Sequence, residues 1–87
     1  MTATEVRLVR REFNISQNAL AREAGCSQAL ISRMESEDME PSEDMLRRLS
    51  SALHRIVARQ RDAKARAYFG DAVIDQINAA AAAFGEP

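Results

Sequence analysis

The stretch that decides the fold is residues 16–36, SQNALAREAGCSQALISRMES. It holds two short segments with apolar residues at helical spacing, and each segment follows a serine that can cap a helix, Ser16 and Ser27. Between the segments lies Gly25, which can take the left-handed conformation that ends a helix. The stretch therefore predicts a helix over 17–24, a tight turn, and a second helix over about 28–35.

The residues before this stretch predict one more helix. Thr4 can cap it, and Val6, Val9 and Phe13 are spaced to form one buried face. Asn14 tolerates the left-handed conformation and is a plausible stop.

Two further helices are expected after it. A polar, acidic stretch over 36–43 is broken by Pro41, and either Pro41 or Ser42 opens a long amphipathic helix that runs to about Ala67. Asp71 is then expected to cap a last helix, on which apolar residues draw a single stripe up to Phe84. The whole chain is predicted to be all-α.

Composition limits the function classes. Among the 87 residues there is one cysteine, Cys26, and one histidine, His54, so neither an internal disulfide nor a metal site is expected. No run of 18 or more apolar residues predicts a membrane span. With no membrane span predicted, we expect a cytoplasmic protein. No nucleophile–base set, carboxylate pair or phosphate loop can be assembled, so we expect that it is no enzyme and has no cofactor.

The charge of the chain is unevenly distributed. The net charge is −1, which is not the basic balance expected of a nucleic-acid binder. Residues 1–50 hold seven arginines against nine acids, residues 51–66 hold five bases against one acid, and residues 67–87 hold three acids and no base. A surface that faces nucleic acid must therefore be a local patch.

Two short helices joined by a glycine turn can hold one helix across another and place it in the major groove of DNA. In this sequence the region from Val6 to Leu53 resembles the Cro-repressor-type helix-turn-helix family, also called the xenobiotic-response-element family. The matching positions are Arg7, Arg10, Ile15-Ser16-Gln17, Leu20-Ala21, Gly25-Cys26-Ser27, Ile31-Ser32, Glu35, Pro41, Leu46, Leu49 and Leu53. The resemblance implies a lambda-repressor-like helix-turn-helix bundle over 1–54, followed by a C-terminal helical extension over 55–87.

The resemblance also implies roles for single residues. Gln17 would hold a phosphate at the start of its helix, and Gln28 would pair with adenine at the start of the recognition helix. Arg33 is the candidate for a guanine contact, although it could equally reach a phosphate. Arg10 and Glu35 resemble a pair that bridges the first helix to the end of the recognition helix. The remaining candidates on the DNA-facing surface are Ser27, Ala29, Ser32 and Ser36.

The sequence departs from the family after Glu35. The family usually has glycine two residues later and basic or polar residues before the proline, whereas this chain has Glu37-Asp38-Met39-Glu40. Carboxylates there would repel phosphate. The loop either turns away from DNA, lowers the affinity, binds a partner, or is simply solvated.

The C-terminal extension predicts an interface. Its apolar stripe either folds back on the chain's own core or pairs with a second copy, and we expect the homodimer because two recognition helices read two half-sites. The basic run from Arg55 to Arg66 either flanks DNA or is the solvated face of the long helix. The predicted interface residues are Ile56, Tyr68, Phe69, Val73, Ile74, Ile77, Ala81 and Phe84.

The function expected from these features is a dimeric, sequence-specific repressor or autoregulator of a prokaryote or phage that binds double-stranded DNA. The alternative is an antitoxin or interaction protein of the same fold, with a partner protein at the acidic loop or the C-terminal helix. Retained DNA binding that changes with a partner would separate the alternative from a pure repressor.

Overall fold

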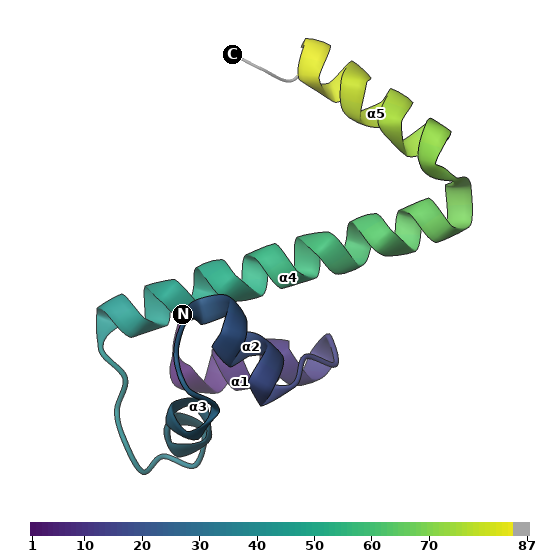
Figure 1. Ribbon diagram of the computed structural model, residues 1–87. Helices are drawn as coiled ribbons and strands as arrows, with labels where there is room; N and C mark the ends of the chain where they lie inside the picture. The colour runs from purple at the N-terminus through teal and green to yellow at the C-terminus, as the bar shows by residue number, and fades with distance from the viewer. Residues whose placement is uncertain (85–87) are drawn as a thin grey trace. The chain divides into compact units, whose positions relative to one another are not determined.

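Five helices and no strands make up the computed structural model, which describes residues 1–84 and the side chains of residues 1–83. The helices are α1 (Ala3–Glu12), α2 (Gln17–Ala24), α3 (Gln28–Glu35), α4 (Glu43–Phe69) and α5 (Asp71–Phe84) (Figure 1). The chain forms two compact units, an N-terminal unit over Met1–Val57 and a C-terminal unit from Ala58 onward. Helix α4 begins in the first unit and ends in the second.

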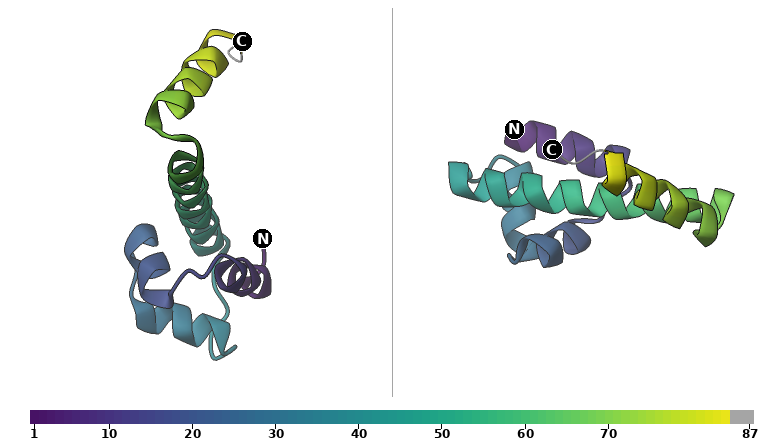
Figure 2. Two further views of the ribbon diagram at one scale, coloured as in Figure 1. Left: turned by 90° about the vertical axis from the view of Figure 1, so that its right-hand side faces the viewer. Right: turned by 90° about the horizontal axis from the view of Figure 1, so that it is seen from above.

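The core of the N-terminal unit joins its four helices. Helices α1, α2 and α3 gather around the first half of α4 (Figures 1 and 2), and α3 packs against both α1 and α2. Val6, Val9 and Phe13 face this core, as predicted, and Cys26 packs against it as a small apolar side chain. The largest fully buried side chains of the core are Val6, Leu20, Ile31, Met34 and Leu49.

The helix starts follow the capping serines closely, with one correction for α1. Ser16 and Ser27 cap α2 and α3, and the Ser42 hydroxyl accepts from the backbone N–H of Met45 at the start of α4. The prediction that Thr4 caps α1 was wrong. Thr2 caps it instead, because Glu5 stands three residues later and closes a reciprocal capping box.

The first three helices end in the same way. In each, a left-handed residue follows the helix, and the next residue's N–H bonds back to a carbonyl in the last turn: Ile15 to Arg10, Cys26 to Ala21, and Asp38 to Arg33. The left-handed residues are Asn14, Gly25 and Glu37. Asparagine and glycine suit this conformation, whereas glutamate does not.

The C-terminal unit consists of the end of α4 and α5. Helix α4 ends at Phe69, slightly later than predicted, and Gly70 takes a left-handed conformation before α5. Asp71 is the first residue of α5 rather than its cap, because the carbonyl of Gly70 accepts from the N–H of Ile74. Arg66 lies 2.9 Å from Asp62, 3.4 Å from Asp71 and 3.3 Å from Asp75, so ion pairs join the two helices.

In the part of the chain that the structure describes, no helix is long and apolar enough to cross a membrane. Among the same residues, no three histidine, cysteine, aspartate or glutamate side chains lie together as a metal site would require.

Candidate nucleic-acid interface

The two helices predicted from residues 16–36 form the expected motif. Gly25, with a φ of 72°, makes the turn between α2 and α3. The hydroxyl of Ser16 accepts from the N–H of Ala19 at 3.0 Å, and the hydroxyl of Ser27 accepts from the N–H of Leu30 at 3.1 Å. Each serine therefore satisfies a backbone N–H that the helix leaves without an internal partner, and this fixes where α2 and α3 begin.

A largely buried ion pair fixes the end of α3 to α1. Arg10 donates from Nε and Nη2 to the two carboxylate oxygens of Glu35, each at 2.7 Å, and from Nη1 to the carbonyl of Ile15 at 2.8 Å. The side chains are only 11% and 6% exposed. This geometry confirms the predicted contact between Arg10 and Glu35, and the paired fork orients α3 relative to α1.

The charge of Glu35 is held by this environment. Burial raises the pKa of its carboxyl, but hydrogen bonds from Arg10 and then Gln17, with the positive charge of Arg10, lower it further than burial raises it. The pKa of Glu35 therefore lies below its ordinary value, and the group is an anion at neutral pH.

Two glutamines continue the network to the start of α3. Gln17 donates from Nε2 to Glu35 at 3.0 Å, and Gln28 donates from Nε2 to Oε1 of Gln17 at 2.6 Å. A continuous chain of hydrogen bonds thus runs from Arg10 through Glu35 and Gln17 to Gln28. The prediction that Gln17 holds a phosphate did not include these bonds. Both the nitrogen and the oxygen of its side-chain amide are hydrogen-bonded within the protein.

The other predicted residues lie on or beside α3. Ser27, Gln28, Ala29 and Arg33 are exposed, and Ser32 is partly buried. Ser36 is exposed as well, but its hydroxyl lies 3.2 Å from the carbonyl of Arg33 and 3.0 Å from the carboxylate of Asp38. Ser36 therefore joins the end of α3 to the acidic loop.

Two arginines that the sequence reasoning did not assign to the motif hold α2 in place. Nη2 of Arg48 donates to the carbonyl of Ala24 at 2.8 Å and to that of Gly25 at 3.2 Å. Arg55 donates to the carboxylate of Glu23 at 2.8 Å and to its carbonyl at 3.1 Å. Arg48 and Arg55 are seven residues apart, which places both on one face of α4, and this spacing could have indicated their shared role from the sequence.

The predicted interface residues divide into three groups. Tyr68, Phe69, Val73 and Ile77 are exposed, with 83%, 57%, 43% and 55% of their surface accessible, and Ala81 is exposed too. Ile74 is buried in the chain, and Ile56 packs against the core of the N-terminal unit. The side chain of Phe84 lies outside the described residues.

Comparison with known families gives one match. The model of a family described as helix-turn-helix matches residues 6–55, which is more than half of the chain. No curated protein and no solved structure matches the chain in the same kind of comparison. The match covers α1 from Val6 onward, all of α2 and α3, and the first half of α4.

Proposed function

Because the chain belongs to the Cro-type helix-turn-helix family of DNA-binding transcription regulators, we propose that it is a dimeric repressor or autoregulator that reads a palindromic operator with α3. In this proposal α3 enters the major groove, and the two recognition helices of the dimer lie about one helical turn of DNA apart. The protein would act where its DNA is, in the cytoplasm of a prokaryote.

The observation that carries this proposal is the hydrogen-bonded chain that ends at Gln28. One N–H of the Gln28 side chain is bonded to Gln17, which leaves its oxygen and its second N–H for a base. An amide oxygen and one N–H are what adenine N6 and N7 require in the major groove. Since Gln17 is itself held by Glu35, the reading group is oriented before DNA arrives.

The exposed neighbours of Gln28 supply the other contacts. The methyl group of Ala29 suits the methyl of thymine, and Arg33, one turn further along α3, suits guanine O6 and N7. Ser27 and Ser32 carry hydroxyls that can donate to a base or a phosphate. The start of α2, beside Gln17, would hold a phosphate through its backbone N–H groups.

The dimer is proposed from the C-terminal unit. Tyr68, Phe69, Val73 and Ile77 are large apolar side chains that remain exposed in the single chain, and they lie within ten residues of one another. Exposed apolar groups gathered in this way are typical of an interface, and aromatic residues are frequent anchors there.

The test is selection from a pool of random DNA duplexes, followed by sequencing of the retained molecules. The wild-type chain should enrich a palindromic site, and Gln28→Ala and Arg33→Ala should each lose preference at one position of each half-site. Gln76→Ala, an exposed glutamine on α5, is the matched control and should enrich the same site as the wild type. Absence of any enriched site at low salt would contradict the proposal.

The second candidate function is that of an antitoxin, which would use the exposed apolar residues of the C-terminal unit to bind a toxin rather than a second copy. The observation that favours it is the same exposed surface. Sedimentation of the purified chain discriminates between the two: a monomer at concentrations that saturate DNA binding would favour the antitoxin.

A further inference from the structure

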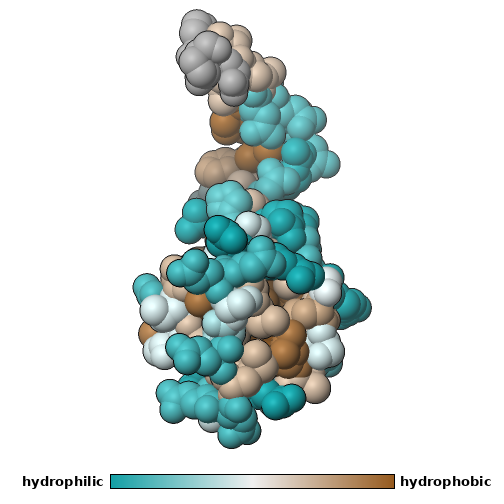
Figure 3. All heavy atoms as spheres, turned by 90° about the vertical axis from the view of Figure 1, so that its left-hand side faces the viewer, coloured by the Kyte–Doolittle hydropathy of each residue, from teal (hydrophilic) through white to brown (hydrophobic). Residues whose placement is uncertain are grey.

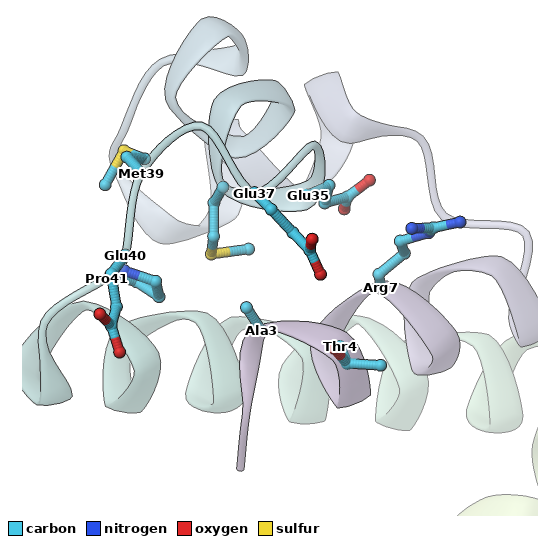
Figure 4. A pocket seen from close by; sticks show the side chains of 9 residues that line it. Ala3, Thr4, Arg7, Glu35, Glu37, Met39, Glu40 and Pro41 are labelled. Carbon is cyan, nitrogen blue, oxygen red and sulfur yellow. The ribbon is translucent and has the colours of Figure 1, made fainter.

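A groove of about 350 Å³ lies between α1 and the loop that joins α3 to α4. Ala3, Thr4 and Arg7 of α1 form one side, and the end of α3 and the loop form the other, as Figure 4 shows. We call this feature the acidic groove, because Glu37 and Glu40 line it from the loop. It lies entirely within the N-terminal unit, and no base-reading side chain proposed above is part of it.

The charges that line the groove are available for a partner. Glu35 also lines it, but its carboxylate is fully engaged by Arg10 and Gln17. Within the described residues, Glu37 and Glu40 make no ion pair, and both are exposed. Figure 4 shows the carboxylate of Glu37 pointing from the loop toward α1. Arg7 lines the opposite side of the groove, but among the described residues no ion pair joins it to Glu37 or Glu40, so the two carboxylates outnumber the one cation that faces them.

The rest of the lining is suited to an aliphatic chain. Met34 is buried and Met39 is partly buried, and Ala3 and Pro41 add further apolar surface. Thioether side chains are flexible and adapt to irregular partners. Figure 3 shows the face of the molecule on which this loop lies in Figure 1. Apolar and hydrophilic side chains are intermixed on that face. This apolar lining with carboxylates at its edge suits a side chain whose methylene groups end in a cation.

We propose that the acidic groove is a docking site for a basic segment of a partner protein. A lysine or arginine of that segment lays its aliphatic stem on Met39 and Pro41, and its cation lies between Glu37 and Glu40. Arg7, across the groove, donates to backbone carbonyls of the segment. Charge complementarity selects this occupant over nucleic acid, because the same carboxylates repel phosphate.

The test uses a short peptide as the probe, with the sequence acetyl-Gly-Lys-Leu-Lys-Gly-amide. It is titrated into the isotope-labelled full chain while amide resonances are followed by NMR. The resonances that move should cluster at the groove, around Ala3, Met34 and residues 37–41. Glu37→Gln together with Glu40→Gln should weaken binding about two- to tenfold, since each exposed ion pair contributes little.

Two controls make the result specific to the groove. Glu12→Gln together with Glu43→Gln removes the same charge from exposed positions outside the groove and should leave the affinity within error of the wild type. A peptide with norleucine in place of lysine should bind more weakly to the wild type.

Three results would overturn the proposal. They are shifts spread evenly over the surface, equal weakening by the control pair, and groove resonances that respond to duplex DNA but not to the peptide. The third result would assign the groove to nucleic acid. None of these outcomes depends on whether α3 reads a palindrome, so the proposed function is tested separately.

Discussion

Glu37 occupies a backbone position that suits glycine. It has a φ of 66° at the end of α3, where Asn14 and Gly25 serve the same purpose for α1 and α2. A side chain with a Cβ costs roughly 1–2 kcal/mol in this conformation. The strain at Glu37 could be inferred from the sequence, because the related family usually has glycine at this position.

We expect Glu37→Gly to raise the free energy of unfolding by about 0.5–1 kcal/mol, because the relief of strain exceeds the extra entropy of the unfolded chain. Urea unfolding followed by circular dichroism measures the change. Glu37→Ala is the control, because it removes the charge and keeps the strain. Equal stabilisation by both variants would mean that charge, and not backbone conformation, is responsible.

Glu35 makes stability depend on pH. Its pKa is lowered in the folded chain, so its contribution is fully present above its ordinary value of 4.5 and is lost as the pH falls through the folded pKa. Glu35→Gln leaves Arg10 buried without its anion and should cost about 3 kcal/mol at neutral pH.

The measurement is the free energy of unfolding of both proteins from neutral pH downward. The difference between wild type and Glu35→Gln should shrink once the pH drops below 4.5. Glu12→Gln, at an exposed site, should track the wild type at every pH. A difference that stays constant would show that the carboxylate's charge is not what the pair contributes.

At the scale of whole elements, the sequence predicted best where capping residues were unambiguous. The bounds of α2 and α3 follow from Ser16 and Ser27, which cap the starts of the helices, and from Gly25, whose left-handed conformation ends α2. The start of α1 was missed because Thr2 and Thr4 can both cap. Only the reciprocal bond from Glu5 decides between them.

Contacts between elements were harder to predict than the elements. The pair of Arg10 and Glu35 came from the family resemblance, whereas the bond between Gln17 and Gln28 depends on the angle at which α2 and α3 cross. That angle is set by packing of the core, which local sequence does not reveal. The contact of Arg48 with the end of α2 was missed for the same reason.

Arg48 should stabilise the packing of α2 on α4. Its guanidinium donates to the carbonyls of Ala24 and Gly25, which the helix leaves without internal partners. We expect Arg48→Ala to lower the free energy of unfolding by about 1–2 kcal/mol. Arg47→Ala, at the neighbouring exposed position, should change it by less than about 0.5 kcal/mol. Equal effects in thermal unfolding would contradict a specific role for Arg48.

At the scale of the whole molecule, the two units divide the proposed work between reading and pairing. The N-terminal unit contains α3 and the network that orients Gln28, and the C-terminal unit exposes apolar side chains that its own helices do not cover. With one arginine on α3 and acids in the following loop, the recognition helix and its surroundings have few positive charges to bind a phosphate backbone. Two copies on one operator would compensate, because the second copy binds at a high effective concentration.

A charge on the apolar face of α5 should disrupt the proposed pairing. Ile77→Asp places a charge among the exposed apolar residues and should convert the proposed dimer to a monomer, as sedimentation would report. Ala79→Asp adds the same charge at an exposed position outside the apolar stripe and should leave the dimer intact. In DNA-binding assays, Ile77→Asp should weaken binding to a full palindrome at least tenfold, while binding to a single half-site stays about the same. If both variants bind the palindrome equally well, pairing through this surface does not contribute to operator binding, and the apolar side chains must serve another partner.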